Sequence, residues 1–368
     1  MTKGYELYGS EFSYFSGKVR AYLRYKRIPF SEIAPTRDLY RDVILARVGW
    51  PVVPVVVTPE DETWQDSSEI IDHFETRFPE GAVYPEGARQ KFAALLIETW
   101  ADEWLKLPAM HYRWKKNRDF AISEFGRMSR PDLDAAEQRV VGEERAKPFE
   151  GSLPVLGVTP AMGPAIEKSY EGLLGELDAH FTKHDFLFGT RPSIGDFGLY
   201  GPLYAHLYRD PASGEIMKRL APKVAEWVQR MTTPPQPKGG TFLAHDEVPE
   251  TLMPVLVRIV REYLPVLLKT AAALKAHVEA HPDLIAGKEP LPRAIGMHEF
   301  DLEGVRDKRA IFTFDLWMLQ RPLDFLASLR GSEREAVLSM IKSAGGEQLA
   351  DFPSYPRLTR RQFQLVVE

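Results

Sequence analysis

The chain has 368 residues, of which 44% are hydrophobic and 27% are charged, and this predicts a globular protein of two or three domains. Its net charge of −5 gives no sign of a nucleic-acid or anionic-membrane partner. No apolar run approaches the roughly 18 residues that span a bilayer, and the start lacks the apolar core of a secretory signal, so we expect a cytoplasmic protein.

The sequence contains no cysteine. This excludes disulfides, thiolate metal ligands and any mechanism in which a thiolate of the protein forms a mixed disulfide. Sulfur chemistry in this protein must therefore use a sulfur atom that a ligand brings.

The amino-terminal part alternates between strand and helix patterns. Tyr5–Tyr8 alternates and stops at Gly9, as a first strand and its turn do. A second strand is expected at 29–33, after a helix whose apolar residues recur with helical spacing: Phe15, Val19, Tyr22 and Leu23. A further helix contains Tyr40, Val43 and Ile44. With the stretch described next, the order is strand-helix-strand-helix-strand-strand-helix, which predicts an α/β layer with some parallel pairing.

Residues 50–74 carry the most specific pattern. Their valine-rich run predicts a buried strand, and because a proline removes a ladder donor, Pro54 should lie at the start or edge of that strand. We expect a cis bond between Val53 and Pro54, since only X–Pro bonds lower the cis penalty to about 0.5–1 kcal/mol. Asp66 and Ser67 then open a helix whose free N–H groups favour a carboxylate. The stretch therefore offers pairing for an extended peptide and, beside it, a carboxylate pocket.

From residue 90 the pattern becomes helical. Helices are expected at 90–104 and 161–183. Ser193 and Asp196 form a capping box before an apolar helix, a feature worth about 1 kcal/mol. The basic cluster at 113–118 is expected on a solvated face.

The last third of the chain follows a proline- and glycine-rich linker at 232–240. Its expected elements are one or two helices, a small hairpin and two more helices, at 251–281, 300–303 with 311–314, 316–329 and 332–344. Trp317, Phe325 and Leu326 indicate that this region packs against the body, because disordered tails are poor in such residues.

Val53-Pro54 before a strand, followed by Asp66-Ser67 at the head of a helix, resembles the glutathione site of the glutathione transferase superfamily. The Ser193 cap resembles that of a buried helix in the same family, and the similarity covers about residues 4–231. The chain resembles a cysteine-free, serine-type bacterial member of this superfamily.

The resemblance implies three parts. A thioredoxin-like, glutathione-binding α/β domain would occupy residues 1–80, and the all-α domain of the family residues 90–231. Residues 241–368 would form an extra, mostly helical extension whose role the sequence does not indicate.

The resemblance also implies how glutathione lies. Its main chain would run along Val53, beside Pro54, and its γ-glutamyl end would meet Asp66 and Ser67, with Gln65 in reach of the same end.

The thiol would lie at the loop before the first helix, where SYFSGKVR is similar to the family pattern. Ser13 begins that pattern and is the expected donor to the sulfur. Tyr14 replaces the usual proline, so Tyr14 or Ser16 is the alternative donor. Such a hydrogen bond to a charged acceptor is worth about 1.5–3 kcal/mol, although serines at this place also serve merely as helix caps.

Three aromatic residues are candidates for the wall of an apolar pocket between the two domains, although aromatic residues at helical spacing also form core: Trp100, Trp104 and Tyr112. We expect no metal site at the two histidine pairs with i, i+4 spacing, because neither has an HExxH pattern: His180/His184 and His277/His281.

The function that the resemblance implies is that of a glutathione transferase with glutathione as co-substrate, in detoxification or related chemistry. The glutathione thiolate would attack an apolar electrophilic small molecule, and the protein would be a homodimer. The alternative is a binding or interaction protein that keeps the fold without the chemistry.

Overall fold

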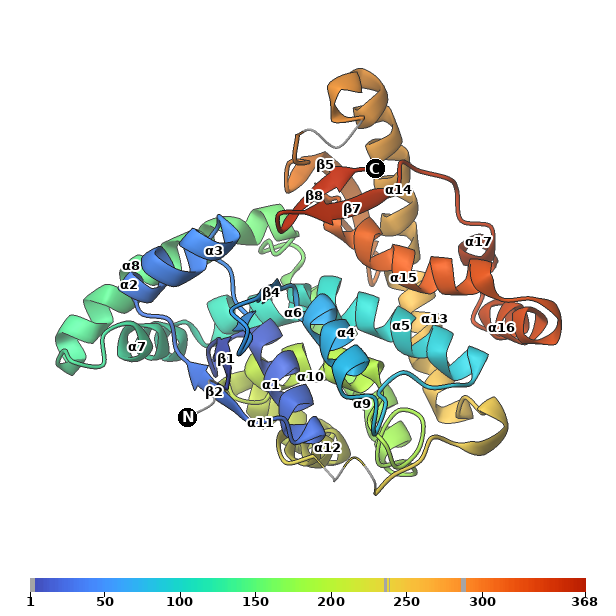
Figure 1. Cartoon of the computed structure of the whole chain (residues 1–368), viewed down its shortest axis with the longest axis horizontal. Helices are drawn as coiled ribbons and strands as arrows, with labels where there is room; N and C mark the ends of the chain where they lie inside the picture. Colours follow the sequence, from blue (N-terminus) through green and yellow to red (C-terminus); the bar gives the residue numbers. More distant parts are fainter. Residues whose placement is uncertain (1–3, 235–236, 238, 286–288) are drawn as a thin grey trace.

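The computed structural model describes residues 4–234, 237, 239–285 and 289–368. Figure 1 shows a small sheet with helices on both of its sides, a helical body beside it, and a carboxyl-terminal region that rises above both. Every helix within the described part is too short or too polar to cross a lipid bilayer.

The amino-terminal part is the predicted α/β layer with a thioredoxin-like element order. Its sheet has the strand order β2-β1-β3-β4, in which β1 and β2 are parallel and the other neighbours are antiparallel. The elements are β1 (Tyr5–Tyr8), α1 (Tyr14–Lys26), β2 (Phe30–Ile33), α2 (Arg37–Leu39), a π-helical segment (Tyr40–Leu45), α3 (Ala46–Val48), β3 (Val55–Val57), β4 (Thr63–Gln65) and α4 (Ser67–Arg77).

The helical body begins with α5 (Ala88–Glu103), close to its predicted bounds. It continues with α6 (Lys106–His111), a π-helical segment (Tyr112–Lys116), α7 (Arg118–Ser129), α8 (Ala135–Leu156), α9 (Gly163–Phe181), α10 (Ile194–Ala205), α11 (Pro211–Leu220) and α12 (Pro222–Thr232). The capping box at the start of α10 is confirmed: the Ser193 N–H donates to the Asp196 carboxylate at 2.8 Å.

Helices α7 and α8 form a hairpin that the sequence did not predict. Figure 1 shows it extending away from the body, beside α2 and α3. Two glycines let the helices approach: a Cβ at Gly126 would lie 1.9 Å from the Gln138 carbonyl oxygen, and one at Gly142 would lie 2.1 Å from that of Ile122. Pro148 and Pro154 lie inside α8. Because proline disfavours the interior of a helix, the sequence of this region did not predict one.

The carboxyl-terminal extension packs against the body, as its aromatic and aliphatic residues predicted. Its elements are α13 (Met253–Glu262), α14 (Leu264–Ala280), β5 (Ala294–Leu302), β6 (Val305–Phe312), α15 (Phe314–Ser328), α16 (Gly331–Ser343), α17 (Glu347–Ala350), β7 (Leu358–Arg361) and β8 (Gln364–Val367), together with 3-10 turns at Ala244–Asp246, Glu250–Leu252 and Pro282–Leu284. The β5–β6 hairpin is longer than predicted, and the β7–β8 hairpin was not predicted.

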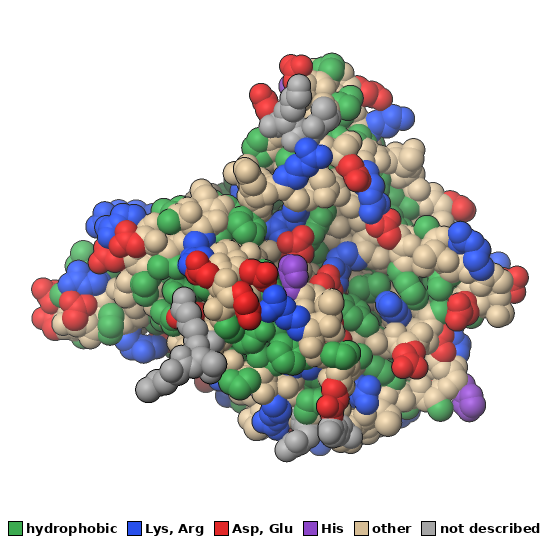
Figure 2. Space-filling view, viewed as in Figure 1, with side chains coloured by type: hydrophobic (Ala, Val, Ile, Leu, Met, Phe, Trp, Pro, Cys, Tyr) green, Lys and Arg blue, Asp and Glu red, His purple; other side chains and the backbone are tan. Residues whose placement is uncertain are grey.

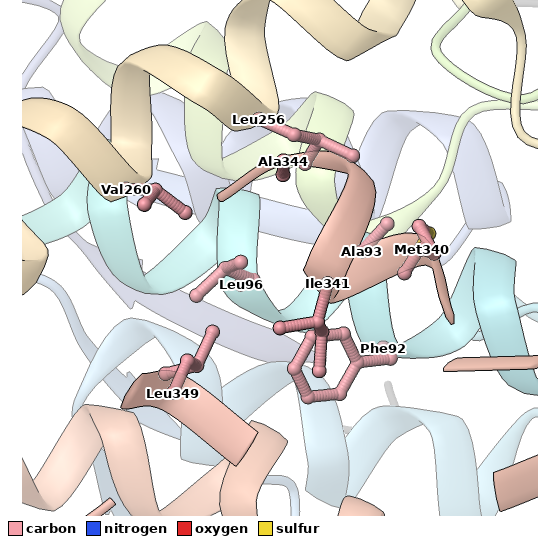
Figure 3. Close-up of a pocket in the computed structure, with 9 residues that line it drawn as sticks. All are labelled: Phe92, Ala93, Leu96, Leu256, Val260, Met340, Ile341, Ala344 and Leu349. Carbon is pink, nitrogen blue, oxygen red and sulfur yellow. The ribbon is translucent and has the colours of Figure 1, made fainter. Parts of the chain in front are cut away.

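Figure 3 shows how the extension meets α5. Side chains of α5, α13, α16 and α17 surround a gap of about 10 Å³, which is about the size of one water. The residues are all apolar: Phe92, Ala93, Leu96, Leu256, Val260, Met340, Ile341, Ala344 and Leu349. This contact is therefore an extension of the hydrophobic core and not a ligand site.

The prediction that the basic cluster lies on a solvated face is wrong for its first residue. Arg113 is 2% exposed, and its Nε and Nη2 donate to the Asp210 carboxylate at 2.8 and 2.9 Å. Its guanidinium lies over the Phe12 ring, 3.5 Å from the centroid. A charge count along the sequence cannot identify such a buried pair, because Asp210 is 97 residues away.

Candidate functional site

The register of the sheet brings the three predicted parts of the site to one edge. Tyr8 ends β1 opposite Val55, which begins β3, and Val55 lies opposite Gln65, which ends β4. Neighbouring strands lie about 4.8 Å apart. The loop before α1, the Val53–Pro54 bond and the start of α4 therefore extend from adjacent strands at the same edge.

Ser13 occupies the N-cap of α1. Its Oγ accepts a hydrogen bond from the Ser16 N–H at 3.3 Å, and the residue is half-buried. A serine hydroxyl that accepts in this way keeps its own proton for a further partner. The hydroxyl therefore lies at the positive end of the α1 dipole with a donor still available.

The two alternative hydroxyls have different surroundings. The Tyr14 hydroxyl donates to the Ala101 carbonyl oxygen, and burial raises the pKa of this phenol well above its ordinary value. Ser16 is fully buried, and its Oγ has no hydrogen-bond partner within the described part of the chain. Tyr14 thus already uses its proton, and Ser16 lies beneath the surface.

Asp66 is the N-cap of α4. Its Oδ1 accepts from the Ser68 N–H at 2.8 Å and from the Glu69 N–H at 3.3 Å. Its φ of 79° lies in the left-handed region, which is unfavourable for a residue with a side chain and recurs at ligand sites. Ser67 follows and is 2% exposed, and its Oγ has no hydrogen-bond partner among the described residues.

Val53 and Pro54 precede the strand and are not part of it. The peptide bond between them is cis, as predicted, and β3 begins at Val55. Val53 pairs with no other backbone group in the described part of the chain. Its N–H and C=O are therefore not used by the sheet.

The three candidate aromatic residues are core in this structure. Trp100, Trp104 and Tyr112 are 0, 2 and 1% exposed. The Trp104 indole N–H donates to Glu262 at 3.2 Å, and its ring meets those of Tyr263 and Phe300, all from the extension. The extension thus covers the indole that was expected to line a pocket.

Sequence reasoning missed the residue that contacts this edge from the far end of the chain. Arg360 of β7 donates through Nη1 to the Gln65 carbonyl oxygen at 2.9 Å and also binds the Gln65 amide oxygen and Glu69. Burial raises the pKa of Glu69 to about 7, against the opposing effect of the Arg360 charge. The only signal in the sequence was the strand-like run Gln-Leu-Val-Val at 364–367.

Two family models match the chain. Residues 7–82 match the glutathione S-transferase N-terminal domain, and residues 145–230 match the glutathione S-transferase C-terminal domain. No curated protein matches the chain.

Solved structures of similar shape include three bacterial proteins. A glutathione S-transferase from Rhodospirillum rubrum F11 is 16% identical, with a TM-score of 0.40, 67% of this chain and 96% of that chain covered. The beta-etherase LigF from Sphingobium sp. strain SYK-6 is 18% identical, with a TM-score of 0.44 and coverage of 64% and 96%. A glutathione transferase family member from Pseudomonas fluorescens, with two glutathione molecules bound, is 13% identical, with a TM-score of 0.40 and coverage of 64% and 91%.

The matched segments contain the residues on which the family resemblance rests. Residues 7–82 include Ser13, the cis Val53–Pro54 bond and the Asp66-Ser67 start of α4, and residues 145–230 include the capping box of α10. The chain therefore carries an N-terminal and a C-terminal domain of the glutathione S-transferase superfamily, at residues 7–82 and 145–230.

Proposed function

We propose that this protein is a glutathione transferase that activates the glutathione thiol for attack on an apolar electrophilic small molecule. The observation that carries the proposal is the convergence, on one edge of the sheet, of an unpaired Val53 backbone and the starts of two helices. Glutathione is a tripeptide with a carboxylate at each end and a thiol between them, so such an edge suits its chemistry.

In this proposal the main chain of glutathione pairs with the N–H and C=O of Val53, as an added strand does. The γ-glutamyl carboxylate then lies at the start of α4, where free N–H groups and the helix dipole favour an anion. Asp66 holds the amine of the same end, and the Ser67 hydroxyl gains a partner. Gln65 lies beside them on β4.

The thiol is placed at the start of α1. A free thiol titrates near about 8.5, and a helix N-terminus with a hydroxyl donor lowers that value. The Ser13 hydroxyl donates to the sulfur, which stabilises the thiolate. The thiolate forms the new bond to the electrophilic carbon as the leaving group departs.

The test is a set of three single variants at the start of α1. In Ser13→Ala, kcat/KM with glutathione and a nitroaromatic electrophile should fall roughly 10- to 150-fold, the equivalent of losing a hydrogen bond to a charged acceptor of about 1.5–3 kcal/mol. The Kd for glutathione should change little. Tyr14→Phe is the matched control and should retain turnover, because the Tyr14 hydroxyl donates to the Ala101 carbonyl.

A second measurement separates the effect of Ser13 on the glutathione thiol from its effect on stability as a helix cap. The pH dependence of thiolate absorbance in the bound complex should show a higher thiol pKa in Ser13→Ala than in the wild type. An unchanged thiol pKa and unchanged turnover in Ser13→Ala would contradict the role of Ser13, and Ser16→Ala then tests the remaining hydroxyl.

The second candidate is a non-catalytic binding protein. Two observations favour it: Tyr14 stands where the family pattern has proline, and the extension buries the indole of Trp104. A wild-type protein that binds glutathione but conjugates none of a panel of electrophiles would establish this candidate. The family resemblance also supports a cytoplasmic homodimer, whose subunits would have to associate without the α5 face that the extension covers.

A further inference from the structure

The tip of the β7–β8 hairpin is bonded to the start of α4. The Arg360 side chain is 5% exposed and lies between the two. Its Nη1 donates to the carbonyl oxygen of Gln65 at 2.9 Å and to Glu69, and its Nη2 donates to the amide oxygen of Gln65 and to the Phe363 carbonyl oxygen at 3.2 Å. Both terminal nitrogens of Arg360 are therefore already used by the protein.

The turn of the same hairpin carries an apolar ring that packs against the amino-terminal domain. Arg361 pairs with Gln364, and the two residues between them have positive φ values, 48° for Gln362 and 63° for Phe363, as a tight two-residue turn requires. Phe363 packs against a buried apolar cluster on the sheet that includes Tyr8 and Val55, and Val53 packs against the same cluster. The ring and Val53 therefore cover one apolar cluster at the strands that carry the candidate site.

The base of the hairpin is held independently of its tip. Gln320 of α15 donates to the Leu358 carbonyl oxygen and accepts from the Leu358 N–H, both at 2.8 Å. The Leu291 N–H donates to the Leu365 carbonyl oxygen at 2.7 Å. In Figure 1 the hairpin reaches from the extension towards β4, and Figure 2 shows acidic and basic side chains close together in this area. The hairpin is anchored on the extension, and its tip closes onto the amino-terminal domain.

A buried polar atom without a partner in the described part of the chain lies between the two residues that Arg360 binds, Gln65 and Glu69. Ser67 is 2% exposed, and its Oγ makes no hydrogen bond with any described residue. A buried hydroxyl without a partner is unfavourable, so it favours any state in which it gains one. Asp66, immediately before it, has the strained φ of 79°. Both residues lie between Gln65 and Glu69, the two residues that Arg360 binds.

We propose that the β7–β8 hairpin is a latch that closes the glutathione site of the free protein, with Arg360 and Phe363 as its two contacts. The inference rests on the proposed function, because it takes glutathione as the ligand of this edge. Opening separates Arg360 from Gln65 and Glu69 and lifts Phe363 from the apolar cluster of Tyr8 and Val55 against which Val53 also packs. Because only the open fraction of the protein binds, the measured Kd is the intrinsic Kd divided by that fraction.

The test measures glutathione binding to the full chain by calorimetry. Arg360→Gln removes the charge that holds the tip, and Phe363→Ala removes the ring. Each should tighten the Kd for glutathione at least threefold and raise the association rate in stopped-flow fluorescence. Arg357→Gln is the matched control: it also removes one positive charge from the hairpin region, where Arg357 pairs with Asp324 and Glu368, and it should leave the Kd unchanged.

The other outcomes separate the two proposals. If wild type binds glutathione and Arg360→Gln binds it equally well, or more weakly, the latch is wrong; weaker binding would mean that Arg360 contacts the ligand. If wild type and both variants give no heat with glutathione while their thermal melts show folded protein, the glutathione site itself is wrong, and the latch fails with it. Phe363→Ala decides the matter if Arg360→Gln does not fold.

Discussion

His180 is a buried histidine whose two ring nitrogens meet residues from different parts of the chain. His180 is fully buried, its Nε2 lies 3.3 Å from the Phe186 carbonyl oxygen, and its Nδ1 lies 2.9 Å from the Thr251 hydroxyl. A carbonyl only accepts, so Nε2 carries a proton. Burial lowers the pKa of His180 and so favours the neutral ring, in which Nδ1 accepts from the threonine hydroxyl.

Burial, helped by the nearby His184, lowers the pKa of His180 to about 4 from the ordinary 6.5. The folded state binds fewer protons than the unfolded state between these values, so the stabilisation is present above pH 6.5 and is lost as the pH falls towards 4. From pH 7 to pH 5 the loss should be about 2 kcal/mol. The His180→Gln variant cannot take up this proton, so its free energy of unfolding should not show the loss. In urea titrations, the free energy of unfolding of wild type minus that of His180→Gln should therefore be about 2 kcal/mol smaller at pH 5 than at pH 7. A difference that stays constant would contradict the neutral histidine.

Two glycines of α10 allow this helix to pack closely against α5. A Cβ at Gly198 would lie 2.9 Å from the Glu98 Cα, closer than such atoms normally approach. One at Gly195 would lie 3.2 Å from the Ala94 carbonyl oxygen. The close crossing brings the buried α10 against α5, and α5 in turn carries Ala101, which binds Tyr14 at the start of α1. The crossing therefore supports the start of α1, which forms one part of the candidate site.

Gly198→Ala should lower the free energy of unfolding by about 1–3 kcal/mol, because the added methyl group forces two backbones apart. Gly175→Ala in α9 is the matched control, since a Cβ there meets nothing within 4 Å. It should be neutral or stabilise by up to about 1 kcal/mol through the loss of unfolded-state freedom. Equal melting temperatures for the two variants would show that the α5–α10 crossing tolerates the methyl group.

The three regions of the chain meet at one buried ionic cluster. Lys18 of α1 lies 2.7 Å from Glu98 and 2.5 Å from Asp102 of α5, and it donates to the Ser68 hydroxyl of α4 at 2.9 Å. Arg321 of the extension lies 3.6 Å from Glu98. Burial opposes the charge on Lys18, but the two carboxylates outweigh it and raise the Lys18 pKa above its ordinary value. The cluster thus joins the candidate site to the extension.

Lys18→Met should reduce the free energy of unfolding by about 3–5 kcal/mol, because it leaves Asp102 buried without its cation and Glu98 with Arg321 alone. Lys223→Met removes an exposed partner of Glu226 and should change it by no more than about 0.5 kcal/mol. Urea denaturation of both variants checks this. A small loss in Lys18→Met would mean that Asp102 takes up a proton at little cost once the lysine is gone.

Local patterns in the sequence determined most of the elements and part of the candidate site. The strand Tyr5–Tyr8, the cis bond at Pro54, the Ser193 capping box and the helix beginning after Asp66 were all predicted, because each depends on neighbours within about one helical turn. The family resemblance predicted the rest of the amino-terminal domain, and residues 7–82 match the family's N-terminal domain.

Tertiary structure alone decided which side chains surround that site. Arg360 and Gln65 are 295 residues apart, and nothing near either residue in the sequence indicates the other. For the same reason the indole of Trp104, spaced as on any amphipathic helix, gave no sign that the extension would bury it. Helical periodicity specifies that a face is covered, whereas the element that covers it is chosen by packing between distant parts of the chain.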